Sequence, residues 1–243
     1  MSGFRLKLSL LVFSLLPILV GLAIWQLSRY QDKKELEQVY ENRRQLPPVT
    51  LSKLAEYQDP LYLPVEVTGK FDPTRYFLLD NQVWQGRAGY ELIMPFKTDD
   101  DRWLLVDRGW IPMIHRDTWP KVNTEKSTQT IKGLVYRTFG KPFLLSEDIW
   151  GEGWPKRIQA IDFQRMKNAL NLSMGDFTLV LDPGQPTVNQ VRPLILNMKS
   201  DRHLGYAFQW FAMALVLMSL YVYRMRSGGR SSHDRNNHNR SAL

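Results

Sequence analysis

The sequence predicts an α+β protein whose mainly antiparallel β domain, with one short helix, lies outside the cytoplasm between two transmembrane helices. Two uncharged runs of 20 residues, Leu8–Leu27 and Leu204–Tyr223, predict the membrane helices, because 20 helical residues rise about 30 Å and so cross the hydrocarbon core of a bilayer. Between them, short runs rich in β-branched and aromatic residues predict strands. The expected organisation is a first helix over residues 1–28, a domain over 29–202, a second helix over 203–224 and a disordered cytoplasmic tail over 225–243.

The composition excludes several classes of protein. With 44% apolar residues among 243, the chain can form a packed core. It has no cysteine, which excludes disulfides, iron–sulfur clusters and thiolate zinc sites. The net charge of +8 comes mainly from the membrane flanks and the tail, since the rest of the chain has 25 basic and 23 acidic residues. We therefore expect no nucleic-acid partner, and the lipid bilayer is the expected surroundings of the two helices.

The first apolar run has two possible interpretations. Gly21 and Ala23 form a small-x-small pattern that could be a signal-peptidase site, but the run is longer than the 7–15 residues usual in a signal peptide. A retained anchor is favoured, with Pro17 tolerated inside the span and Trp25 in the aromatic belt at its end.

The charge of the chain ends predicts the orientation. The segment after Tyr223 contains five arginines and one aspartate, and basic flanks stay on the cytoplasmic side of a membrane. Both termini are therefore expected in the cytoplasm. The central domain is then outside, which in a bacterium with these helices in its inner membrane means the periplasm.

The domain begins after a charged stretch, residues 31–41, that can extend the first helix until Pro47 and Pro48 end it. The clearest hairpin covers residues 89–111, with a polar turn at 98–101 that is a better explanation of its three aspartates than a calcium site. A helix is expected over residues 162–172, capped by Asp162. The strands are expected in seven runs, at residues 61–71, 75–80, 89–97, 102–111, 129–137, 157–162 and 177–182.

Enzyme motifs do not occur in this sequence, which has no G-x-S-x-G, Walker A, G-x-G-x-x-G or H-E-x-x-H pattern. We therefore expect a protein that is not an enzyme. Asp80, Glu91 and Asp107 are interpreted as solvated or turn residues. Arg108 beside Trp110 could stack on the ring or bind an acidic group, and a structural role is at least as plausible.

His203 is the strongest candidate for a functional residue. A histidine at a membrane surface can be an interfacial hydrogen-bonding group, and its imidazole can also ligate a metal ion, including the iron of haem. Tyr206 and Trp210 follow at spacings of three and seven, so they share a helix face with His203 and would offer aromatic surface to a flat macrocycle.

Seven sequence pieces, in order between the two spans, resemble the SURF1/Shy1 family of membrane-bound assembly factors for haem-copper cytochrome c oxidase. The final piece is most similar to the bacterial members. The pieces are WQLSRYQDK (25–33), GKF (69–71), LLDNQVWQGRAGYELIMPF (78–96), VDRGWIP (106–112), WPKRIQAIDFQRM (154–166), LDP (181–183) and RHLGYAFQWFAMA (202–214).

The resemblance implies a non-catalytic role in maturing oxidase subunit I, with haem a bound transiently and with the haem A synthesis machinery as a further partner. It also implies that His203 contacts haem, and that Trp25 and Gln26 face it from the first helix. Ala23 stands where the family often has glycine, so close packing of the helices is less secure at that position.

A second function remains open from the sequence. Two anchors could simply hold a periplasmic ligand-binding or scaffolding domain that has no part in respiration.

Overall fold

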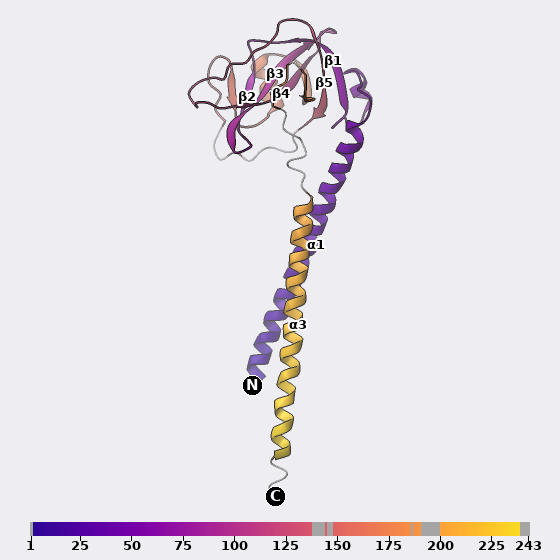
Figure 1. Cartoon of the computed structure of the whole chain (residues 1–243), viewed down its shortest axis with the longest axis vertical. Helices are drawn as coiled ribbons and strands as arrows, with labels where there is room; N and C mark the ends of the chain where they lie inside the picture. Colours follow the sequence, from indigo (N-terminus) through magenta and orange to yellow (C-terminus); the bar gives the residue numbers. More distant parts are fainter. Residues whose placement is uncertain (1, 138–143, 145–147, 186, 191–199, 239–243) are drawn as a thin grey trace. The chain divides into compact units, whose positions relative to one another are not determined.

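The computed structural model describes residues 2–137, 144, 148–185, 187–190 and 200–238, with the side chains of the last segment described to Ser227 (Figure 1). The chain forms two compact units, Met1–Gln38 with Ile195–Leu243 and Val39–Leu194. The first unit contains most of helix α1 (Ser2–Arg44) and helix α3 (Asp201–His238). The second is a β domain with one short helix, so the predicted α+β class is confirmed.

Both predicted membrane spans are helical. The run Leu8–Leu27 lies within α1 and Leu204–Tyr223 lies within α3, and by length and composition both helices can cross a membrane. Pro17 lies inside α1. The helix continues through the charged residues to Arg44 and ends before Pro47, as the sequence predicts.

The tail differs from the expectation of disorder from residue 225. Helix α3 continues to His238 and so includes most of that polar segment. A helix that is already formed can add residues without a new nucleation cost, since each added residue contributes one further hydrogen bond. The polar composition of the tail therefore did not predict where the helix ends.

The described part of the second unit has seven strands, and each overlaps one of the seven predicted runs. Helix α2 (Phe163–Leu170) also forms where it was expected, and the Asp162 side chain accepts a 3.0 Å hydrogen bond from the Arg165 amide at its N-cap. The strands are β1 (Pro64–Phe71), β2 (Phe77–Trp84), β3 (Arg87–Thr98), β4 (Trp103–Pro112), β5 (Gln129–Tyr136), β6 (Lys156–Ile158) and β7 (Met174–Leu181).

Five strands close into a small barrel (Figure 1). The sheet order is β1-β5-β7-β4-β3-β2-β6, and an additional pairing between β1 and β3 completes the ring, leaving β2 and β6 as an extension. Pairing is antiparallel except between β2 and β6 and between β4 and β7. Gly69 pairs with Thr98 at the closure, and a Cβ there would collide with the Lys97 carbonyl oxygen. A glycine is therefore needed where the ring closes.

Alternating residues of the strands fill the barrel, as the period of two requires. On β3, Tyr90, Leu92, Met94 and Phe96 belong to the inner core and are all fully buried. The Phe96 ring meets Phe71 of β1 edge-on, with 4.8 Å between centroids.

The opposite face of the sheet has a second core, covered by α2 and the segment before it. Ile93 and Leu105 point to this face and pack with Met166 of α2. Trp154 packs there against Phe77 with 5.2 Å between ring centroids. The domain is therefore a barrel with one covered face.

Each of the two hairpins has a tight turn, and the one between β3 and β4 was predicted from the sequence. Gln85 and Gly86 join β2 to β3 with positive φ angles of 49° and 76°, as a type I′ turn requires. At the end of β3, the Thr98 amide donates to the Arg102 carbonyl and the Asp101 amide donates to the Thr98 carbonyl. The aspartates at residues 99–101 thus form a hairpin turn.

Candidate functional site

Helices α1 and α3 pair antiparallel, and polar contacts join them at each end of the apolar region. At one end, the hydroxyl groups of Ser9 and Tyr221 are 2.9 Å apart, and the Tyr221 ring lies edge-on to Phe13. At the other end, the His203 Nδ1 atom is 2.8 Å from the Gln26 Oε1 atom.

The spacing of these contacts matches the thickness of a bilayer. Ser9 and Gln26 are 17 residues apart on α1, and His203 and Tyr221 are 18 apart on α3. At 1.5 Å per residue the two pairs are separated by about 26 Å along the helices, close to the depth of the hydrocarbon core. In a bilayer crossed by this helix pair, the His203–Gln26 contact would lie near one surface and the Ser9–Tyr221 contact near the other.

Small residues line the contact between the two helices. Ala23 of α1 is fully buried, and Ala207 and Ala214 of α3 are 3% and 5% exposed. Val12 and Leu19 of α1 are also buried, and with Ala23 they recur at spacings of seven and four along one stripe. Ala23 is completely buried, so a methyl group fits at this position of the helix contact, where glycine is frequent in the resembled family.

The contact with Gln26 fixes the protonation pattern of His203. An amide oxygen can only accept a hydrogen bond, so the Nδ1 nitrogen is the donor. In the neutral ring the lone pair then lies on Nε2, and the described residues provide no hydrogen bond to that atom. An imidazole oriented through one nitrogen with the other free is the arrangement in which histidine ligates a metal.

The first turn of α3 has a cap that the sequence analysis missed. Ser200 precedes the helix, its carbonyl accepts a 2.9 Å bond from the His203 amide, and it is 2% exposed. Glu37 of α1 accepts from both the amide and the hydroxyl of Ser200, at 3.2 and 3.1 Å. A carboxylate at a helix N-terminus is favourable, so Glu37 holds the turn that carries His203. A serine before the helix was the only signal available in the sequence.

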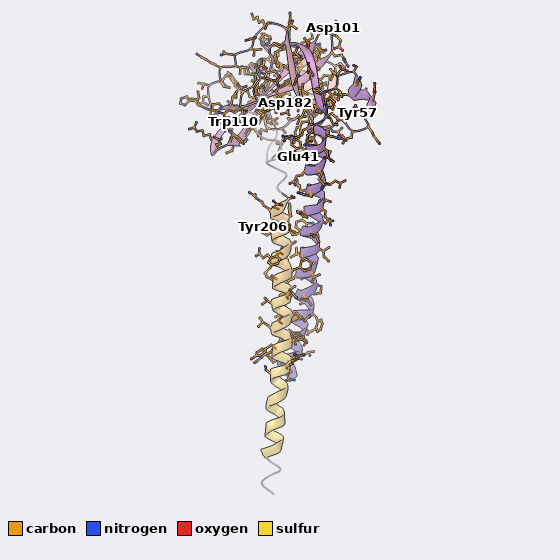
Figure 2. All side chains as sticks on the ribbon, turned by 45° about the vertical axis from the view of Figure 1, so that its right-hand side comes forward. Glu41, Tyr57, Asp101, Trp110, Asp182 and Tyr206 are labelled. Atoms are coloured by element: carbon orange, nitrogen blue, oxygen red, sulfur yellow. The ribbon has the colours of Figure 1, made fainter. Side chains whose placement is uncertain are left out.

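The aromatic residues of the predicted site are on the same two helices as the histidine and are at least partly exposed. Tyr206, labelled in Figure 2, is 54% exposed and Trp25 is 50% exposed, while Trp210 is partly buried. Trp25 adjoins Gln26 and is therefore about 100° from it around α1. Of the two α1 residues expected to face His203, the structure brings Gln26 within hydrogen-bond distance, and among the described residues Trp25 has no hydrogen bond to His203.

These residues fit a planar iron macrocycle better than a bare metal ion. The described residues contain no group of three His, Cys, Asp or Glu side chains placed to hold a metal. A single histidine can be the axial ligand of an iron whose other ligands come from a porphyrin. The half-exposed rings of Tyr206 and Trp25 add apolar surface on the same helix pair.

In the β domain, Arg108 is a buried structural residue. It lies over the Phe71 ring, with 4.9 Å from the guanidinium carbon to the centroid, and does not stack on Trp110. Its nitrogens donate to the carbonyls of Thr187 and Asn123 and to the Thr124 hydroxyl at 2.8–2.9 Å. Burial lowers the pKa of Arg108 to about 10, so the group is still charged at neutral pH.

The interpretation of the carboxylates as solvated is wrong for two of three. Asp80 is 3% exposed, accepts from the Asn81 amide at 2.8 Å and pairs with Arg116 at 3.2 Å. Glu91 is 6% exposed on β3. Both residues lie on strands whose two faces are packed against other parts of the domain. The alternation of polar and apolar residues along one strand does not show that its second face is also packed. Asp107 accepts a bond from the Gly109 amide, as a turn-type residue does.

Comparison with known proteins identifies the family. The model of the SURF1 family matches residues 13–215. A SURF1-like protein of Rickettsia felis is 29% identical over 231 residues, covering 91% of this chain and 98% of the relative. One from Rickettsia prowazekii is 30% identical over 231 residues and covers 91% of each chain. A more distant SURF1-like protein, from Caenorhabditis elegans, is 25% identical over 93% of this chain and 74% of its own length.

The matched region includes the barrel, helix α1 from residue 13, helix α3 to residue 215 and all five residues of the candidate site. The match therefore extends over the α+β domain and over parts of both helices that are long and apolar enough to span a membrane. The chain belongs to the SURF1 family.

Proposed function

We propose that this protein is a non-catalytic assembly factor for haem-copper cytochrome c oxidase. In this proposal it receives haem a at its paired membrane helices and assists its insertion into oxidase subunit I. The observation that carries the proposal is the His203–Gln26 pair, which leaves the Nε2 nitrogen without a hydrogen-bond partner among the described residues, close to one end of the apolar region. Family membership supports cytochrome c oxidase as the client, since the SURF1 family is known for oxidase assembly.

The proposed cargo is held by one axial ligand. His203 would supply its Nε2 lone pair, Gln26 would keep the proton on Nδ1, and Trp25, Tyr206 and Trp210 would contact the macrocycle. A transfer protein must release its cargo, and a haem held by a single protein ligand is easier to release than one held by two. A haem partitioned into the bilayer would meet both the carrier and a membrane-embedded client by diffusion in two dimensions.

The proposed location is the bacterial inner membrane, with both termini in the cytoplasm and the β domain in the periplasm. The arginines after Tyr223 support this orientation, as basic flanks favour the cytoplasmic side. The proposed partners are then subunit I, the haem A synthesis machinery and the bilayer itself.

Membranes from cells with and without this gene test the assembly role. We expect the reduced-minus-oxidised spectrum to lose the haem a band, with other haems retained, and oxidase activity to fall with it. An unchanged spectrum and activity, while the oxidase is expressed and no second copy of the factor is present, would contradict the proposal. It would favour a scaffolding or ligand-binding role for the anchored domain.

A further inference from the structure

Exposed apolar side chains gather at the end of the β domain where β2 turns into β3. Val83, Ile114 and Trp119 are 62%, 79% and 49% exposed. We call this region, together with the partly buried Trp84 and the exposed Arg87 and Arg116, the hairpin-tip surface. Single exposed apolar residues are normal on a protein, so the argument depends on these side chains lying together.

The strand register places the two aliphatic residues near one another. Val83 of β2 pairs with Ala88 of β3, and the Met113 amide donates to the Ala88 carbonyl on the other side, at 3.1 Å. Neighbouring strands are about 4.8 Å apart, so Val83 and Met113 are about 10 Å apart across β3. Ile114 follows Met113 directly. In Figure 2, Trp110 marks this end of β4 and Asp101 marks the opposite end of the domain.

Side-chain contacts add the aromatic and basic members. The Arg157 guanidinium lies between Trp119 and Tyr90, 5.1 and 5.7 Å from the two ring centroids. Its Nη2 atom also donates to the Arg116 carbonyl at 2.5 Å. Tyr90 is two residues from Ala88, so Trp119 and Arg116 belong to the same end of the sheet as Val83.

The residue types are those found at a lipid–water boundary. Tryptophan and arginine each combine an apolar body with a polar end, and they lie preferentially at headgroup depth, where aliphatic side chains can reach the acyl chains. The exposed Arg87 would meet lipid phosphates with complementary charge, whereas Arg116 is paired with Asp80. A protein partner would also accept apolar residues, but two helices that are long and apolar enough to cross a membrane flank this domain and would hold it beside one.

We propose that the hairpin-tip surface binds the lipid headgroup layer of the membrane that anchors the chain. The dimensions allow it. The charged end of α1, from Arg29 to Arg44, is 16 residues and rises about 24 Å, whereas the 12 residues of β3 extend about 40 Å. The domain can therefore be long enough for one end to return to the surface from which α1 emerges. This contact would give the domain a fixed orientation on the membrane.

Single cysteines can test the contact directly, because the chain has none of its own. The variants Ile114→Cys and Ile149→Cys are a matched pair, as the two isoleucines are 79% and 82% exposed. Ile149 adjoins Trp150, which packs on Phe77 at the far end of β2 from Val83. Each full-length variant is spin-labelled and reconstituted into phosphatidylcholine vesicles, with and without phosphatidylglycerol.

The collision rates of each label with oxygen and with a water-soluble nickel chelate give its depth. We expect the oxygen-to-nickel ratio at position 114 to exceed that at position 149 several-fold, and Arg87→Glu to lower the ratio at 114 in the anionic vesicles. Equal, water-like ratios at both positions would overturn the proposal. So would a label at 114 that is water-accessible in lipid alone and becomes shielded only when the oxidase is added, since that would show a protein partner.

Discussion

In the β domain, the Arg108 guanidinium donates to two carbonyls and a hydroxyl, whereas the His203 imidazole in the helix pair has one side-chain partner, Gln26, among the described residues. The arginine uses its donors in holding the barrel together and is almost completely buried. The histidine is oriented and retains a nitrogen available to a ligand. Stability and ligand binding are therefore expected to separate between the two units, and substitutions can test this separation.

The largest effect is expected from emptying the barrel core. Phe96→Ala removes a fully buried ring that packs on Phe71, and a Phe-to-Ala cavity costs about 3–5 kcal/mol of unfolding free energy. Urea unfolding of the full-length protein in detergent, followed by near-ultraviolet circular dichroism, measures it. Ile149→Ala, at an exposed site, is the control. A loss below about 1 kcal/mol for Phe96→Ala would show that the barrel is not the stable core of the domain.

A smaller loss is expected at Arg108. Arg108→Ala leaves the carbonyl of the buried Thr187, and that of Asn123, without this donor, at a cost of about 2–3 kcal/mol. Arg108→Lys keeps the charge but loses the planar fork, so we expect it to destabilise the domain nearly as much. The same unfolding assay measures both. A stable Arg108→Ala protein with impaired haem binding would reverse the roles assigned to the two units.

Acid should weaken the domain through Asp72. Burial raises the pKa of Asp72, but hydrogen bonds from Thr74 and Arg75 outweigh it and lower the pKa below its ordinary value. A carboxyl with a lowered folded pKa stabilises the protein above its unfolded pKa of about 3.9, and this contribution is lost as the pH falls through the folded value.

Asp72→Asn should therefore flatten the dependence of unfolding free energy on pH below about 4, with a lower value at neutral pH. Unfolding measured from pH 6 downward compares the variant with the parent chain. An identical acid slope in both would show that Asp72 contributes nothing to it.

The smallest effect on stability, with a large effect on the site, is expected at Gln26. Hydrogen bonds between membrane helices contribute about 0.6 kcal/mol, so Gln26→Leu should leave the helix pair folded. Without the Gln26 acceptor, the proton of the neutral His203 ring should no longer be confined to Nδ1. Nitrogen-15 NMR of the imidazole should then detect a mixture of the two tautomers. Gln26→Glu, which can still accept from Nδ1, should keep the single tautomer. A single unchanged tautomer in Gln26→Leu would contradict the role given to Gln26.

Local patterns predicted most of the elements. Alternation and turn residues were enough for the seven strands, and Asp162 was enough for α2, because those signals act within a few residues. Barrel closure at Gly69 and Thr98 depends on backbones about 30 residues apart, and a single strand pattern contains no information on its partner. For the same reason, the burial of Asp80 and Glu91 could not be predicted from their own strands.

Sequence patterns also predicted some residues of the candidate site and missed others. Helical spacing brought Tyr206 and Trp210 to the face of His203, and the family resemblance suggested Gln26. The cap that Glu37 provides for Ser200 joins residues 163 positions apart, and no local pattern indicates it. The half-exposed Trp25 shows the limit of the resemblance, since a neighbour in sequence lies about 100° away on a helix.

Titration of the purified full-length protein with haem, beside His203→Ala, tests the central claim most directly. The Soret band reports binding, and circular dichroism confirms that both proteins are folded. We expect the parent chain to bind and the variant to lose most of the affinity, because the only proposed axial ligand is gone. Unchanged affinity and an unchanged spectrum in His203→Ala would contradict the assignment of the histidine as the haem ligand.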